Sequence, residues 1–301
     1  MNPPLEARPC CDVSVVIPTK NSGRTIRSCI VSVLRERPGE IIVVDSSSKD
    51  DTLTILSKYP IRVIHDRSRS LAHQRQLGVE ASKGSYIMFV DSDIVLEAGC
   101  IDELRDDLKM KGWGGVHAKI LSAENASYWQ RAVDEEFSTL ENTIGQKRRI
   151  GTAAALFKKS VLQAHPFDVR LKESYEDVDL CRRLVNDNVT LGGSNAIVYH
   201  YHRREFQEFV RQRFRGGLGQ ARMGNKYRQR RVVTLLDPLV GALSRMLRSK
   251  GTRKIRLIPY WEFKGSAEFV GVLVGFHKLR YVNPPLPKSQ GGTRYIDAYG
   301  R

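Results

Sequence analysis

The chain has 301 residues, which is enough for one large domain or two modest ones with a well-developed core. Its five cysteines are odd in number and lack paired C-x-x-C spacing, so they indicate neither a disulfide framework nor a structural zinc site, and we predict buried free thiols. The N-terminus lacks the charged-then-apolar layout of a signal peptide, so we expect the folded body to lie in the cytoplasm.

The net charge of +16 is concentrated in the last third of the chain. Residues 200–301 hold 22 Lys/Arg and 6 Asp/Glu, and the difference of +16 equals the net charge of the whole chain. Such a region favours a polyanionic partner, which could be nucleic acid, an anionic membrane face or a phosphorylated substrate. A merely soluble surface would normally intersperse both signs of charge.

Short apolar runs alternate with amphipathic stretches over the first 90 residues. The pattern predicts strands at 13–17, 40–44, 61–64 and 86–90, and helices at 26–34, 51–58 and 70–82. Apolar strands separated by helices are typical of an α/β fold with a mostly parallel, Rossmann-like sheet and helices on both faces. Ligands of such sheets bind at the carboxyl ends of the strands.

Chemically distinctive residues follow three of these four strands. They are Pro18, Thr19, Lys20 and Asn21 after the first, Asp45 after the second, and Asp91, Ser92 and Asp93 after the fourth. Alternate residues of a strand point to one side, so Asp91 and Asp93 can share a site suited to a hard cation carrying phosphate oxygens. Because the chain lacks glycine-rich dinucleotide and P-loop motifs, we predict a nucleotide held by carboxylates and a metal. A turn or N-cap role is the alternative for any single Asp.

The middle of the chain is less regular. The pattern predicts a helix at 100–109, a strand from 113, a helix at 126–141, a mobile basic loop at 146–149 and strands at 151–157 and 197–202. An acidic cluster that includes Glu176, Asp177 and Asp179 opens a further helix, where negative charge is favourable, and simple capping is the alternative. His200 and His202 would face one side of the last strand, as an extra metal ligand or as structural residues.

The C-terminal region contains an arginine-rich helix at 203–223 and two apolar runs, at 232–247 and 269–276. Neither run reaches the ~20 apolar residues that span a bilayer. The first is interrupted by Asp237-Pro238 and bordered by arginines, a pattern typical of a helix in the membrane interface; packing on its own domain is the alternative. The expected organisation is an N-terminal tail (1–11), a catalytic domain (12–202), a basic region of amphipathic interface helices (203–282) and a flexible tail (283–301).

Several of these stretches together resemble the family 2 glycosyltransferases, inverting enzymes of the glycosyltransferase-A fold that use nucleotide-diphospho-sugars. The matching stretches are 15–21, 42–50, 71–78 and 86–93, and 176–180 is similar to the acidic motif that carries the base of that family. The resemblance covers residues 12–202. Gln76 departs from it, because the family usually has Asn at this position.

The resemblance implies a role for each candidate residue. Those expected to bind the nucleotide-sugar are Pro18, Thr19, Asn21, Asp45, Arg75, Asp91 and Ser92. Asp93 would hold Mg2+ or Mn2+ together with His200, for which His202 is the competitor. Asp177 would take the proton from the acceptor hydroxyl, and Glu176 and His202 would contact the diphosphate or the acceptor. The metal would neutralise the departing diphosphate, and inversion needs no covalent intermediate.

Residues 212–216 are similar to the Q-R-x-R-W motif of cellulose-synthase-like, membrane-associated enzymes, with Gly216 in place of Trp. By this resemblance Gln212, Arg213 and Arg215 would contact the diphosphate or the acceptor.

The function that these resemblances imply is metal-dependent transfer of a hexose, mannose or glucose, from a UDP- or GDP-sugar. The acceptor would be linked to a lipid phosphate at the cytoplasmic face of the cell membrane, as in glycolipid or N-glycan precursor assembly, and contact with the anionic membrane would be peripheral. The alternatives are a soluble transferase with a non-lipid acceptor, a nucleic-acid-binding protein, and an inactive scaffold. No nucleic-acid module is recognised, and intact Asp93 and Asp177 count against the scaffold.

Overall fold

The computed structural model describes residues 10–68, 70–124, 127–138, 142–248 and 251–279. The chain forms two compact units. The first comprises 1–125, 133–170 and 176–202, and the second comprises 126–132, 171–175 and 203–301. The main division therefore falls after His202, where the catalytic domain was expected to end, while two short segments from within that domain belong to the second unit. Apart from Cys10 and Cys11, which begin the first strand, the expected tails lie outside the described residues.

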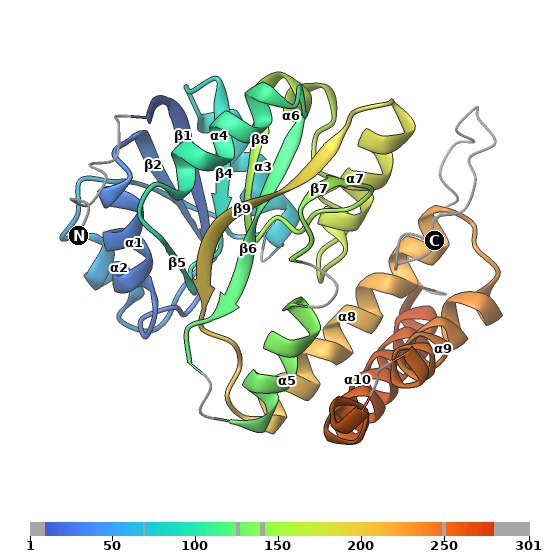
Figure 1. Cartoon of the computed structure of the whole chain (residues 1–301). Helices are drawn as coiled ribbons and strands as arrows, with labels where there is room; N and C mark the ends of the chain where they lie inside the picture. Colours follow the sequence, from blue (N-terminus) through green and yellow to red (C-terminus); the bar gives the residue numbers. More distant parts are fainter. Residues whose placement is uncertain (1–9, 69, 125–126, 139–141, 249–250, 280–301) are drawn as a thin grey trace. The chain divides into compact units, whose positions relative to one another are not determined.

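A nine-stranded mixed sheet forms the centre of the first unit (Figure 1). Within the described residues the strands are β1 (Cys10–Thr19), β2 (Pro38–Asp45), β3 (Arg62–His65), β4 (Tyr86–Val90), β5 (Ile94–Leu96), β6 (Gly115–Ser122), β7 (Gly145–Lys147), β8 (Ala154–Lys158) and β9 (Leu191–His200). Their order is β3-β2-β1-β4-β8-β6-β9-β5, and β7 pairs with β9. The first four strands are parallel, as predicted, whereas β8 runs antiparallel between β4 and β6.

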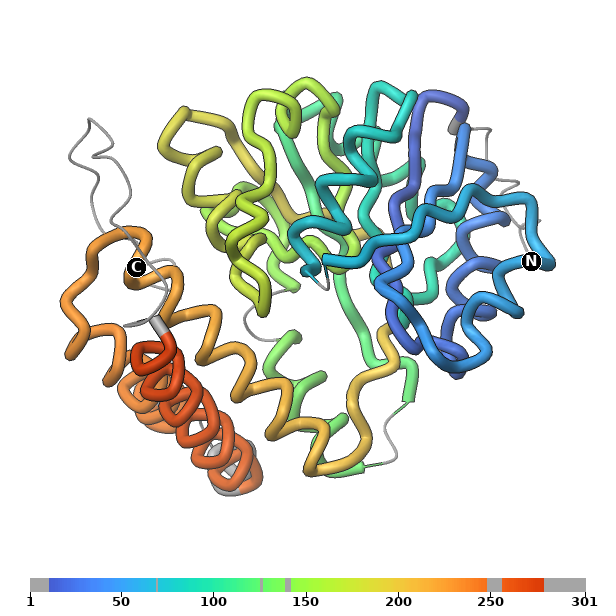
Figure 2. Tube along the Cα trace, turned by 180° about the vertical axis from the view of Figure 1, so that it is seen from behind, coloured from blue at the N-terminus to red at the C-terminus, as the bar shows by residue number. Residues whose placement is uncertain are grey.

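Helices cover both faces of this sheet, as Figures 1 and 2 show. They are α1 (Ile26–Arg35), α2 (Thr52–Leu56), α3 (Leu71–Ala81), α4 (Cys100–Met110), α6 (Lys159–Ala164) and α7 (Glu176–Asn186). The apolar faces of α1, α2 and α4 pack in one core with Val15, while α3, α6 and α7 pack in the other with Val16. Adjacent strand residues point to opposite faces, which explains why the continuous apolar runs serve two cores. The predicted α/β fold is confirmed.

The predicted free thiols agree in part with the structure. Cys29, Cys100 and Cys181 are buried and free, whereas Cys11 is exposed. Burial raises the pKa of the Cys181 thiol to about 12, so this side chain behaves as a small apolar group in the core.

Three local predictions were wrong. The basic stretch at 146–149 is not simply a mobile loop, because Gly145–Lys147 form β7, antiparallel to β9. The strand predicted to reach residue 202 ends at His200. The helix from residue 231 continues through Asp237-Pro238 rather than being interrupted there. Strands of three residues, such as β5 and β7, are too short for an apolar period to reveal them.

The second unit is helical. It contains α8 (Phe206–Lys226), α9 (Arg231–Arg248) and α10 (Gly251–Leu279), which pack on one another (Figure 2), and the start of α5 (Tyr128–Glu136). The apolar run at 269–276 is the end of the long helix α10 rather than a separate short one. Among the described residues, no helix is both long and apolar enough to cross a membrane.

Close packing in this unit depends on glycine and on aromatic rings. A Cβ on Gly217 of α8 would collide with the backbone oxygen of Glu268 in α10, so a larger residue would separate the two helices. Trp129 stacks on Phe209 with ring centroids 4.8 Å apart and also contacts Phe206. These contacts attach the first turn of α5 to α8.

Candidate functional site

The carboxyl ends of β1 and β2 are joined by a side chain that sequence reasoning missed. Thr19 lies beside Asp45 in the parallel register. The amide of Gln74, buried on α3, donates to the backbone oxygens of Thr19 at 3.1 Å and of Val44 at 2.6 Å. Gln74 therefore fixes the separation of the two strand ends. The available signal was a polar residue on the buried face of an otherwise ordinary helix.

The loops after these strands are shaped by Asn21 and Asp45. The backbone nitrogen of Asn21 donates to the Ser48 hydroxyl at 2.8 Å, and its side-chain oxygen accepts from the Lys49 nitrogen at 2.8 Å. Asn21 adopts a φ of +49°, which Asn tolerates better than most residues. The buried carboxylate of Asp45 accepts from the Ser48 nitrogen at 3.0 Å. Pro18 and Thr19 are also buried, so these residues form the floor and loop framework of the site.

A tight turn after β4 positions the paired carboxylates. The backbone nitrogen of Asp91 donates to the backbone oxygen of Ala153 at 2.8 Å, and the backbone nitrogen of Ile94 donates to the backbone oxygen of Asp91 at 3.0 Å. Residues 94–96 then pair antiparallel with β9, with Ile94 opposite His200. As a result, Asp93 Oδ1 lies 3.2 Å from His200 Nε2. The structure thus brings together the pair predicted to hold the metal, by means of the short strand β5.

Two further site candidates lie at this turn and after β9. The Ser92 hydroxyl is 2.7 Å from that of Ser22, in the loop after β1. His202 is buried beyond the end of β9, and its ring centroid lies 4.3 Å from that of His200 and 5.6 Å from that of Phe137. The histidines are neighbours because the chain turns, with the His202 nitrogen donating to His200 at 3.0 Å, rather than because they share a strand face.

Arg75 connects the carboxyl end of β4 with helix α7. Its side chain is only 2% exposed, and it forms ion pairs with Asp91 Oδ1 at 2.8 Å and with Glu176. Burial raises the pKa of Glu176 to about 7 and also raises that of Asp91, while the Arg75 guanidinium acts in the opposite direction on both. Two carboxylates from different elements therefore share one buried cation.

Asp177 is the second residue of α7 and lies next to this buried cluster. It is half-buried, and its Oδ1 accepts from the Val178 nitrogen at 2.8 Å. Its charge also acts on Arg75 and raises the pKa of Glu176. The predicted base, Asp177, thus lies beside Arg75 and Glu176. Its carboxylate is at the N-terminus of α7, where the helix dipole is positive.

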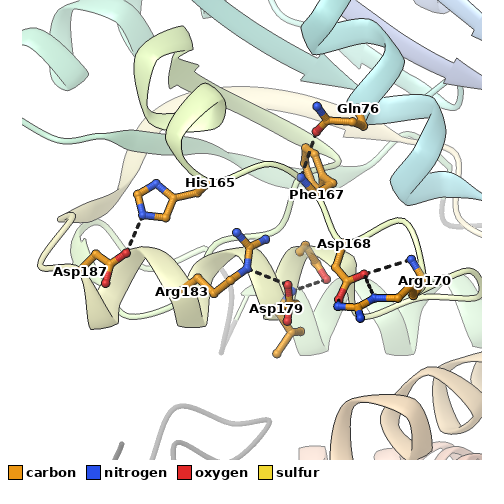
Figure 3. Close-up of polar contacts among 10 residues, drawn as sticks. Gln76, His165, Phe167, Asp168, Arg170, Asp179, Arg183 and Asp187 are labelled. Carbon is orange, nitrogen blue, oxygen red and sulfur yellow. Dashed lines mark hydrogen bonds and ion pairs between the residues drawn. The ribbon is translucent and has the colours of Figure 1, made fainter. Parts of the chain in front are cut away.

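Polar contacts hold α7 and the segment before it in place (Figure 3). Arg183 Nε lies 2.9 Å from Asp179, one turn away on α7, and His165 Nε2 lies 2.8 Å from Asp187 at the helix end. Gln76 Oε1 accepts from the Phe167 nitrogen at 3.0 Å. The Gln that departs from the family pattern therefore has a structural role in this chain.

Asp93 and His200 fit a divalent cation whose coordination is completed by the substrate. Among the described residues, no group of three His, Cys, Asp or Glu side chains forms a metal site. A carboxylate facing an imidazole, as Asp93 faces His200, is a suitable donor pair. Mg2+ usually binds through one or two carboxylates together with substrate phosphates. The two side chains would supply the protein's part of such a site.

The remaining candidates lie in the second unit. Gln212 and Arg215 are exposed on α8, and Arg213 lies 3.9 Å from Glu268 of α10, with its guanidinium 5.3 Å from the Phe209 ring centre. Their proposed contacts with diphosphate or acceptor remain predictions.

A comparison with known families assigns the chain. The model of "Glycosyl transferase family 2" matches residues 14–178, more than half of the chain. The chain belongs to glycosyl transferase family 2. The matched residues include the strand ends, Arg75 and Asp177, whereas His200 lies beyond them. The family resemblance is confirmed, and its cellulose-synthase-like extension stays a prediction.

Individual relatives and solved structures are similar to this family 2 chain. The poly(ribitol-phosphate) beta-N-acetylglucosaminyltransferase TarP of Staphylococcus aureus is 31% identical over 167 residues, half of each chain. S. aureus TarS 1-349, solved with UDP-GlcNAc, superposes with a TM-score of 0.51 at 14% identity, over 89% of this chain and 91% of that one. Glucosyl-3-phosphoglycerate synthase of Mycobacterium tuberculosis, solved with Mg2+ and UDP, gives 0.50 at 19% identity, over 66% and 74%. The two structures show that the fold is shared. The chain spans about half or less of the curated relatives it matches.

Proposed function

We propose that the protein transfers a hexosyl group, mannose or glucose, from a UDP-sugar to an acceptor hydroxyl with inversion at the anomeric carbon. The observation that carries this proposal is Arg75, which ties Asp91 at the donor end of β4 to Glu176, the neighbour of Asp177. A donor-binding carboxylate and a candidate base are thereby held in one rigid cluster. The shared fold with proteins solved with UDP-GlcNAc, or with UDP and Mg2+, supports UDP over GDP.

In the proposed reaction each side chain has a separate task. Asp177 accepts the proton as the acceptor oxygen bonds to the anomeric carbon, and the broken sugar–phosphate bond leaves its electron pair on UDP. Arg75 holds Asp91 in place, and Gln74 and Asp45 keep the strand ends at their spacing. A bound Mg2+ or Mn2+, held by Asp93 and His200, would supply the charge that stabilises the departing diphosphate.

We further propose that the acceptor is linked to a lipid phosphate and that the reaction takes place at the cytoplasmic face of the membrane. The basic excess of residues 200–301 supports an anionic acceptor or surface. The relative TarP is named for a poly(ribitol-phosphate) acceptor, which is also rich in phosphate.

The direct test compares the wild type with Asp177→Asn, using radiolabelled UDP- and GDP-sugars, membrane lipid extract and Mg2+ or Mn2+. We expect metal-dependent transfer from a UDP-sugar that falls by about 10²–10⁴-fold in the variant, because the acceptor proton loses its base. Asp187→Asn is the matched control, since Asp187 lies at the other end of the same helix, on the surface. Wild-type rates in Asp177→Asn would refute the assignment of the base.

A further inference from the structure

Helix α9 turns its large apolar residues toward solvent. These side chains are 37–66% exposed and comprise Val232, Val233, Leu236, Leu239, Val240, Leu243 and Leu247. They recur every three or four residues and therefore form one continuous stripe along the helix, here called the α9 stripe. In a helix that packs its apolar side on its own domain, this stripe would be buried. The structure shows the reverse arrangement.

The inward side of α9 consists of small or polar residues. Thr234, Pro238, Gly241 and Ala242 are buried and follow the same helical spacing on the opposite face. A Cβ added to Gly265 of α10 would lie 2.9 Å from the Cβ of Ala242, which shows how closely the helices approach. Small residues are sufficient for α9 to pack within the second unit. The large aliphatic residues of the stripe therefore do not contribute to that packing.

Charge around the stripe favours an anionic partner. Arg230 and Arg231 are exposed at the N-terminus of α9, where the helix dipole disfavours cations. The one acidic residue in the sequence of α9, Asp237, lies off the stripe and accepts from Gln220 Nε2 at 2.7 Å. An anion bound near the first turn would relieve the unfavourable charge of the two arginines. The surface thus combines a long aliphatic face with a basic end.

We propose that α9 lies flat in the interface of an anionic lipid bilayer, with the α9 stripe among the acyl chains and Arg230 and Arg231 at the headgroup phosphates. Contiguous exposed apolar surface marks a contact site, and aliphatic residues beside arginines suit a helix at the headgroup boundary. A second copy of the chain is a poorer partner, because both copies would carry the basic excess of residues 200–301 and would repel each other. The inference deepens the proposed function, on whose lipid-linked acceptor it rests, by naming the surface that meets the lipid.

The test measures co-sedimentation of the full chain with phosphatidylcholine vesicles, with and without phosphatidylglycerol. We expect binding that requires phosphatidylglycerol and weakens with salt. Leu236→Glu combined with Leu243→Glu should reduce it at least tenfold, because carboxylates must then enter the acyl region. Arg230→Gln combined with Arg231→Gln should remove most of the preference for phosphatidylglycerol.

Controls separate this surface from general effects of charge and from the transfer reaction. Met110→Glu combined with Ile144→Glu makes the same change at exposed apolar residues of the first unit, and should bind vesicles like the wild type. Asp177→Asn should also bind normally, so failure of the transfer proposal leaves vesicle binding intact. Wild-type binding by the Leu236/Leu243 variant, or no vesicle binding by the wild type, overturns the inference. A dimer in light scattering that this variant disperses would instead assign the stripe to a second copy.

Discussion

At the scale of single residues, Arg75 is the connection between donor site and base. It is buried and paired with Asp91 and Glu176, which come from a strand end and a helix start. Family resemblance predicted that Arg75 lies near the nucleotide, but the contact with Glu176 depends on the packing of α3 against distant elements. The family resemblance therefore identified the residues and did not reveal the bridge between them.

Replacing Arg75 tests this connection. Arg75→Met keeps much of the side-chain volume but leaves the buried Glu176 carboxylate and the partly exposed Asp91 carboxylate without their cation. Removing one partner of a buried ion pair costs about 3–5 kcal/mol, so we expect a large loss of unfolding free energy and at least a hundredfold loss of transfer activity. Arg170→Met is the control, because Arg170 pairs with Asp168 at the surface, where such pairs contribute about 0–1 kcal/mol. Equal stability of the two variants would contradict the role given to Arg75.

Glu176 gives a prediction about pH. Its pKa in the folded protein is raised to about 7, chiefly by burial, so the folded state binds a proton more tightly than the unfolded chain does. The resulting stabilisation is fully present below the ordinary glutamate pKa near 4.5 and is lost as the pH rises through about 7. Denaturant unfolding between these pH values should show wild-type stability falling by up to about 3 kcal/mol more than that of Glu176→Gln. Parallel stability curves for the two proteins would rule this out.

At the scale of elements, the sequence predicted the long, strongly patterned segments well. The fourth strand was predicted at 86–90 and is found there, and α1, α3 and α4 agree with their predicted ranges to within one or two residues. The direction of strands and the pairing of short strands were harder to predict. An apolar run does not show whether a strand such as β8 is parallel to its neighbours, and three residues are too few to show an apolar period. The contact between Asp93 and His200 depends on β5, so its geometry could not be derived beforehand.

The role of β5 can be tested at Val95, which pairs with Tyr199 of β9. Val95→Pro removes a backbone donor and disfavours pairing within the sheet, so Asp93 and His200 should separate. We expect the affinity for Mn2+ in the presence of UDP to fall at least about tenfold, as in His200→Ala, when measured by calorimetry. Val95→Thr, which keeps the backbone donor and the β-branch, should bind like the wild type. Unchanged Mn2+ binding in Val95→Pro would exclude this role for β5.

At the scale of the whole molecule, the division of charge corresponds to a division of structure. The neutral two-thirds of the chain supplies most of the unit with the sheet and the candidate site, and the basic third supplies most of the helical unit. Helical periodicity predicted an apolar stripe at 232–247 but not the side to which it would turn. That side is set by Thr234, Gly241, Ala242 and the glycines opposite them. These small residues are buried because they allow the helices to pack closely, not because they are strongly hydrophobic.

The central claim is direct, inverting transfer by a family 2 site that uses one base and no covalent intermediate. The most direct measurement is the anomeric configuration of the first product formed from an α-linked UDP-sugar in the presence of Mg2+ or Mn2+, read by NMR from the one-bond carbon–proton coupling at the anomeric carbon. The account predicts a β-linked product, formed about 10²–10⁴-fold more slowly by Asp177→Asn. An α-linked product from the wild type would contradict it.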